Sequence, residues 1–124
     1  METHIGKGRD LISLGQAIRY QVFTIEQNIP AELDIDGLDD DSFHAIVTER
    51  SIPIATARLT VRSDGSSTMA RVAVMEAYRG FGIASKVVQA LKEHAKSMGV
   101  GSIEIHAHGY LRSYYEKLGF EFAK

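Results

Sequence analysis

Two glycines and an alanine stand where the strongest helical pattern of the chain begins, in residues 79–84 (RGFGIA). The start of a helix presents backbone N–H groups that have no intrahelical partner, together with the positive end of the helix dipole. Glycine lets a phosphate reach those groups without meeting a Cβ, and the guanidinium of Arg79 would add a charge-assisted donor. The segment therefore predicts a phosphate-binding turn. The alternative is a tight strand-to-helix turn, in which glycine is frequent for other reasons.

The spacing of this segment differs from the better-known phosphate-binding motifs. A P-loop requires Gly-Lys-Ser/Thr after four intervening residues, and residues 80–86 (GFGIASK) do not supply it. A dinucleotide-binding fingerprint requires a third small residue three residues after Gly82, where Ser85 stands, and a parallel βαβ unit with a ribose-binding acid, which the sequence does not indicate. The segment is therefore interpreted as neither of these two motifs.

Side chains elsewhere could donate or accept protons. His106 ends a predicted strand, where it could act as a general base or could be a partly buried polar residue. Tyr114 and Tyr115 fall on the apolar side of a short predicted helix, and from position alone we interpret both as core residues. His44 opens an earlier strand, and there we expect a structural hydrogen bond.

The hydrophobic pattern predicts the elements that position these groups. We expect helices at residues 11–25, 83–98 and 111–118, and strands at residues 1–5, 43–48, 54–62, 68–75, 102–106 and 120–122. The Asp64-Gly65 pair predicts a hairpin, so the strands from 43 to 75 should form an antiparallel meander. Gly99 should end the long helix in a left-handed conformation. The apolar face of the first helix should comprise Leu11, Leu14, Ile18, Val22 and Ile25. The result is a mixed α/β domain.

Composition excludes several classes of protein. With 124 residues, 44% hydrophobic and 24% charged, we expect one compact domain over residues 1–124. A net charge of −2 offers no general attraction to nucleic acid or to anionic lipid. The absence of cysteine excludes disulfides, thiolate metal sites and a cysteine nucleophile. No signal peptide and no run of ~18 apolar residues is found, so we expect no membrane association and a cytoplasmic location.

Three segments in the right order resemble the GNAT N-acetyltransferases. Residues 71–91 (RVAVMEAYRGFGIASKVVQAL) are similar to the acetyl-CoA motif of that family, a strand followed by Arg/Gln-x-x-Gly-x-Gly/Ala at a helix start. Residues 102–121 (SIEIHAHGYLRSYYEKLGFE) are similar to its second half, which ends in Phe/Tyr-Tyr-Glu-Lys-x-Gly-Phe. Residues 18–47 resemble a bacterial branch of small GNAT proteins whose substrates are mostly unassigned. The resemblance covers nearly the whole chain.

The resemblance implies the GNAT fold, a central, mostly antiparallel sheet with splayed central strands flanked by helices. It also implies acetyl-CoA as co-substrate. The preceding strand would pair its main chain with the pantetheine arm, at Val72, Ala73 and Val74. The turn would hold the pyrophosphate, at Arg79, Gly80, Phe81, Gly82, Ile83, Ala84 and Ser85. His108 stands where relatives often carry an Asn or Gln that contacts CoA. No metal is implied.

The resemblance further implies direct attack of a primary amine on the thioester in a ternary complex. The N–H near Val74 would stabilise the oxyanion, a contribution of ~3 kcal/mol when well placed. Tyr115 matches the tyrosine that protonates the departing thiolate, and a phenol with a pKa of ~10 can donate at neutral pH. Glu26 borders the acceptor groove in relatives, so it is a candidate base beside His106. Alternatively, Glu26 only caps or pairs within a bend of the first helix.

Residues 32–41 (ELDIDGLDDD) carry six acids but lack the spacing of a calcium-binding loop. We expect a solvated acidic loop. If it borders the acceptor groove, it would favour a cationic acceptor such as a polyamine, an aminoglycoside or a lysine side chain of a protein.

Relatives usually continue beyond the Gly-Phe at 119–120 with a C-terminal hairpin, whereas this sequence ends at Lys124. We therefore expect a GNAT fold without that hairpin, and a homodimer in which a second protomer completes the sheet is one alternative. Another is a catalytically weak or inactive GNAT-fold module that binds acyl-CoA. A nucleic-acid-binding helical domain finds no basic stripe to support it.

Overall fold

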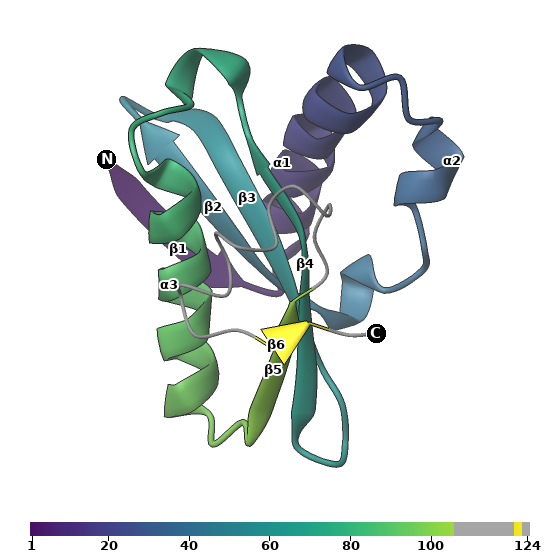
Figure 1. Cartoon of the computed structure of the whole chain (residues 1–124), viewed down its shortest axis with the longest axis vertical. Coiled ribbons are helices and arrows are strands. Elements are labelled where there is room, and N and C mark those ends of the chain that lie inside the picture. Colours follow the sequence, from purple (N-terminus) through teal and green to yellow (C-terminus); the bar gives the residue numbers. More distant parts are fainter. Residues whose placement is uncertain (106–120, 123–124) are drawn as a thin grey trace.

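The computed structural model describes residues 1–105 and 121–122. Within them, six strands form one sheet in the order β1-β2-β3-β4-β5-β6, with α1 and α3 on opposite faces (Figure 1). Antiparallel pairing joins β1 (Glu2–Gly6), β2 (Phe43–Glu49), β3 (Ile52–Val61) and β4 (Ser66–Val74) in chain order. Parallel pairing adds β5 (Ser102–Ile105) to β4 and β6 (Glu121–Phe122) to β5. The mixed α/β class predicted from the sequence is confirmed.

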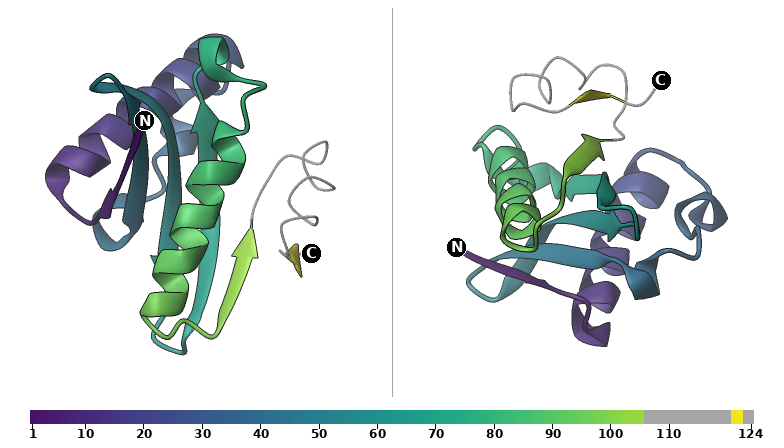
Figure 2. Two further views of the ribbon diagram at one scale, coloured as in Figure 1. Left: turned by 90° about the vertical axis from the view of Figure 1, so that its left-hand side faces the viewer. Right: turned by 90° about the horizontal axis from the view of Figure 1, so that it is seen from below.

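The predicted meander of β2, β3 and β4 is also confirmed. Its second turn is closed by the Asp64-Gly65 pair, as expected, because the Ser66 N–H donates to Asp64 Oδ1 at 2.9 Å and Gly65 adopts a φ of 87°. The first turn uses Arg50 and Ser51, which have φ values of 51° and 68°. Beyond this meander, β5 diverges from β4 toward its C-terminal end (Figure 2).

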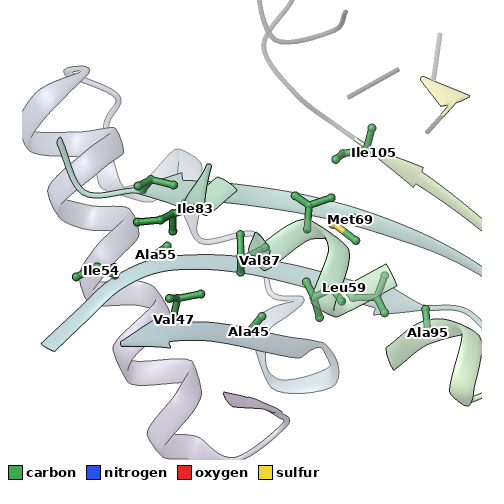
Figure 3. Packing of buried hydrophobic residues seen from close by; sticks show 14 residues of the cluster. Ala45, Val47, Ile54, Ala55, Leu59, Met69, Ile83, Val87, Ala95 and Ile105 are labelled. Carbon is green, nitrogen blue, oxygen red and sulfur yellow. The ribbon is translucent and has the colours of Figure 1, made fainter. Parts of the chain in front are cut away.

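Helix α3 (Ile83–Ser97) covers one face of the sheet and forms the larger core. The sequence pattern predicts a buried face that comprises Ile83, Val87, Leu91, Ala95 and Met98. The first four are buried, but Met98 lies beyond the end of the helix and is exposed. The four buried residues pack against strand residues of the cluster drawn in Figure 3, which include Ala45, Val47, Ala55, Leu59 and Met69. Gly99 follows the helix with a φ of 78°, which confirms the left-handed ending.

Helix α1 (Arg9–Arg19) covers the other face and continues as the π-helix η1 (Tyr20–Glu26). The predicted apolar face is right at Ile18 and Val22 but wrong at Leu14 and Ile25, which are exposed. Gly15 faces the sheet instead, so closely that a Cβ there would lie 3.1 Å from Thr56 Oγ1. This close approach sets the rotation of the helix and turns Leu14 outward.

Three short elements complete the described part of the chain. The helix α2 (Ala31–Asp34) and the 3-10 turn η2 (Asp39–Asp41) lie in the acidic segment between η1 and β2. The 3-10 turn η3 (Glu76–Tyr78) joins β4 to the glycine turn. None of the described helices is both long enough and apolar enough to cross a membrane.

Candidate active site

The glycine turn lies between η3 and the first turn of α3. Gly80 and Gly82 have φ values of 85° and 75°, a conformation that side-chain-bearing residues rarely adopt. A Cβ built at either position would meet no described atom within 4 Å, so none of residues 1–105 fills the space beside the turn. The turn therefore has a backbone conformation that requires glycine, and a ligand could approach that backbone from the side of the built Cβ atoms.

The start of α3 is electrostatically suited to an anion. Gly82 is the N-cap, and the Lys86 N–H donates to its carbonyl at 3.1 Å as the first helical bond. At the start of an α-helix the first backbone N–H groups point away from the helix body, toward the glycine turn in this case. No acidic side chain stands in this first turn, so the positive end of the dipole is not neutralised there. Phe81 is 75% exposed beside it.

Strand β4 leads into this turn and contains an irregularity. Arg58 pairs with Ala70 and Thr56 with Ala73, so Arg71 and Val72 both lie opposite Ala57. This two-against-one arrangement is a β-bulge, which bends a strand and re-aims its side chains. The pairing of β4 with the described part of β5 ends at Met69 and Ile105. Of the three residues predicted to contact pantetheine, Val72 is the second residue of the bulge, and Ala73 and Val74 follow it directly.

Arg79 connects the turn with the first helix. Its Nε donates to the Val74 carbonyl at 3.0 Å, and its two terminal nitrogens donate to the Glu26 carboxylate at 2.5 and 2.6 Å. These hydrogen bonds lower the pKa of the Glu26 carboxyl below its ordinary value. Glu26 thus pairs with a residue of the glycine turn rather than within the bend of the first helix. A lowered pKa makes a carboxylate a weaker base.

A groove of about 330 Å³ lies beside this ion pair, between η1, the start of β3 and η3. Its walls are mostly apolar and include Val22, Ile25, Ile54 and Met75, while Glu26 and Glu76 supply carboxylates. None of residues 79–85 lines it, so the groove is distinct from the space beside the glycine turn.

The prediction of a solvated acidic loop is wrong for Asp34 and Asp39. The Asp39 side chain is 9% exposed and that of Arg19 is 1% exposed, and they form an ion pair at 2.8 Å. Arg19 also donates to Asp34 Oδ2 at 2.8 Å. Arg58 pairs with Asp36 at 2.7 Å and with Asp39 at 3.2 Å. The acids are therefore neutralised by arginines from α1 and β3, which are distant in the sequence. Asp40 and Asp41 are exposed.

This network sets the charge states of its members. Burial would raise the pKa of Asp39, but hydrogen bonds from Arg19 and Gln16 outweigh it and lower that pKa far below its ordinary value. Burial lowers the pKa of His44. The His44 Nε2 lies 2.8 Å from the Asp39 carbonyl, which can only accept, so Nε2 carries the proton. The structural hydrogen bond predicted for His44 is confirmed.

Other predicted site residues lie outside the described residues, namely His106, His108, Tyr114 and Tyr115. In the described ranges, no cluster of three or more His, Asp or Glu side chains could hold a metal. Sequence reasoning missed Arg71, whose guanidinium lies 3.0 Å from Asp34 Oδ1. The sequence did contain a signal for these ion pairs. Arg58 and Arg71 lie within two otherwise apolar strands, and a buried arginine requires an acidic partner.

Comparison with known proteins agrees with this arrangement. The model of the Acetyltransferase (GNAT) family matches residues 14–120. The uncharacterized N-acetyltransferase YjcF of Bacillus subtilis (strain 168) is 28% identical over 120 residues, which cover 97% of this chain and 85% of YjcF.

Solved structures show the same fold. A candidate N-acetyltransferase from Lactobacillus plantarum is 28% identical with a TM-score of 0.86, covering 94% of this chain and 82% of that one. A predicted acetyltransferase from Clostridium acetobutylicum, crystallised with acetyl-CoA, is 22% identical with a TM-score of 0.75, covering 99% and 91%. The predicted GNAT fold is thereby confirmed. Because the family model spans most of its length, the chain belongs to the GNAT family of acetyltransferases and is an N-acetyltransferase by that membership.

Proposed function

We propose that this protein transfers an acetyl group from acetyl-CoA to a primary amine by direct attack in a ternary complex. The observation that carries the proposal is the glycine turn at the start of α3, which follows β4 and the 3-10 turn η3 and leaves its backbone accessible. A Cβ at Gly82 would enter the space that a pyrophosphate needs, and the positive end of α3 favours its charge. The backbone of residues 79–85 is the proposed pyrophosphate site.

Strand β4 supplies the proposed site for the pantetheine arm, through the main chain of Val72, Ala73 and Val74. Ala73 and Val74 are buried against the two opposite cores, so the strand is held from both faces. A strand fixed in this way can present its polar groups in advance, which is how a preorganised N–H stabilises a developing oxyanion. The Val74 N–H is the proposed donor.

In the proposed reaction, the amine nitrogen attacks the thioester carbon, the C–N bond forms and the C–S bond breaks. The thiolate then takes a proton, for which Tyr115 is the proposed donor. The amine nitrogen loses one proton as the amide forms. Because Glu26 is paired with Arg79, His106 is the preferred one of the two candidate bases to accept this proton. His108 is a proposed contact of CoA. We place the reaction in the cytoplasm, and the acceptor is a small-molecule or protein amine.

The test is calorimetric titration with acetyl-CoA and with CoA, followed by thiol release in the presence of primary amines. The amines should include a polyamine, an aminoglycoside and a lysine peptide, with Tyr115→Phe as the variant for proton donation. Binding with amine-dependent thiol release supports the proposal. Binding without release by any amine favours the alternative, an acyl-CoA-binding module. A folded sample that binds neither ligand contradicts both.

A further inference from the structure

Arg71 has a backbone conformation that is rare for its residue type. Its φ is 57°, in the left-handed region, although it belongs to strand β4 and is not a glycine. Such a conformation persists only where the surrounding structure determines it, and it is therefore a reason to look for a role. Arg71 is also the first residue of the β-bulge opposite Ala57.

Two carboxylates of the acidic segment hold the Arg71 side chain. Its Nε lies 3.0 Å from Asp34 Oδ1, and one terminal nitrogen lies 3.2 Å from Asp36 Oδ2 and 3.3 Å from the Asp34 carbonyl. The two acids are themselves fixed, since Asp34 pairs with Arg19 and Asp36 pairs with Arg58. The bulge is thus held by the ion pairs of Arg71 with Asp34 and Asp36, here called the clamp. Through these acids the clamp is anchored to α1 and β3.

The bulge decides which face each following residue occupies. Met69 packs in the α3 core, and beyond the bulge Val74 is again in that core while Ala73 packs against α1. In a strand without the extra residue, alternation from Met69 would place Val74 on the α1 side and Ala73 on the α3 side. The clamped residue therefore sets the orientation of the segment that leads to the glycine turn.

We propose that Arg71 is a positioning residue, which holds the bulge so that residues 72–74 present their main chain to the pantetheine arm. This inference rests on the proposed function, because it assumes that the arm of acetyl-CoA lies along β4. On this proposal the acidic segment holds β4 in place through Arg71. Loss of the Arg71 ion pairs should therefore weaken the binding of ligands that carry the pantetheine arm and not of ligands that lack it.

The experiment compares two ligands that differ in the arm. Acetyl-CoA carries it, whereas adenosine 3′-phosphate 5′-diphosphate, the nucleotide half of CoA, does not. Arg71→Ala removes the ion pairs of the side chain but leaves a residue with a Cβ at positive φ, and it should weaken acetyl-CoA binding by about tenfold or more. Binding of the nucleotide half, measured by calorimetry or by displacement, should stay within about twofold, since its site is the glycine turn.

Two further variants approach the clamp separately. Arg71→Gly loses the side chain but tolerates the bulge conformation, so its loss of acetyl-CoA affinity should be smaller than that of Arg71→Ala. Asp36→Asn keeps Arg71 and removes one of its anchoring charges, and it should show the same selectivity for the ligand with the arm. These two variants carry the test if Arg71→Ala does not fold.

Arg50 provides the matched control, because it is exposed in the β2–β3 turn with a φ of 51°. Arg50→Ala and Arg50→Gly should leave the affinities for both ligands unchanged. Equal losses for the two ligands in the Arg71 variants, or no loss of acetyl-CoA affinity, would overturn the inference. If the wild-type protein binds neither ligand, the proposed function fails instead.

Discussion

Arg79 contacts two distant parts of the chain from its place in the glycine turn. It donates to the carbonyl at the end of β4 and to the carboxylate at the end of η1. The two oxygens of Glu26 accept from the two terminal nitrogens, the bidentate geometry that gives an arginine–carboxylate pair its directional strength. The pair therefore holds Arg79, the first residue of the glycine turn, in position. This is a structural role for Glu26 that requires no proton transfer.

Glu26→Gln should distinguish this role from that of a base. With the charge removed, the guanidinium is held less firmly, and we expect acetyl-CoA affinity to fall by about threefold to tenfold. The pH profile of kcat should keep its shape. A general base would instead show a fall in kcat of roughly 10²-fold or more, together with a changed profile.

The control for this measurement is Glu76→Gln. Glu76 is exposed and lines the same groove as Glu26, so the variant makes an identical change of charge nearby. It should leave acetyl-CoA affinity unchanged, and an equal loss in both variants would show a general electrostatic effect.

At the scale of elements, the acidic segment is a structural part of the sheet assembly. Its carboxylates face arginines on α1, β3 and β4, so it joins one helix and two strands. Removing one member of such a buried network leaves an uncompensated charge, which costs far more than losing an exposed pair.

Asp39→Asn should therefore lower the free energy of unfolding by about 3 kcal/mol, because Arg19 and Arg58 both lose a buried partner. Asp41→Asn, two residues away and exposed, should change it by less than about 0.5 kcal/mol. Urea unfolding of the two variants is the measurement. Equal stabilities would show that Asp39 behaves as a surface acid.

The sequence predicted those elements whose stability is encoded locally. The meander and α3 follow from alternation, the Asp64-Gly65 turn and one apolar helix face, and all are found. The π-helix η1 and the bulge at Arg71 were not predicted, because each depends on contacts with segments far away in the sequence. The acidic segment was predicted to be solvated for the same reason. The sequence shows the charges of its acids but not which distant arginines pair with them.

At the scale of the whole molecule, buried ionisable groups make stability depend on pH. The folded-state pKa of His44 is lowered from an ordinary 6.5, and Arg19, Arg58 and the Asp39 carbonyl surround the ring. The unfolded chain therefore binds a proton on His44 more readily than the folded chain does. Stability from this group is complete above that pH and is lost as the pH falls below it.

Asp39 adds a second, more acidic step. Its folded-state pKa is also lowered, here from an ordinary 3.8, so its contribution is present above that pH and is lost below it. Urea midpoints measured from about pH 8 to about pH 2 should fall in two stages. His44→Gln, which does not titrate in this range, should remove the first stage and keep the second. A first stage that persists in the variant would assign it to another group.

The two faces of the sheet have different roles. The α3 side holds the larger core and the helix start that the proposed pyrophosphate site requires, while the α1 side carries the ion-pair network that fixes β4. The two meet in β4, whose Val74 belongs to the core on the α3 side and whose Ala73 belongs to the core on the α1 side.

Titration of Gly82→Ala with acetyl-CoA, against Gly99→Ala, tests the central claim most directly. Both glycines flank α3 at positive φ, and a Cβ at either meets no described atom within 4 Å, so the two variants impose similar backbone strain. We predict that Gly82→Ala lowers acetyl-CoA affinity by at least about tenfold, whereas Gly99→Ala binds like the wild type. Wild-type affinity in Gly82→Ala would contradict the assignment of the turn as the pyrophosphate site.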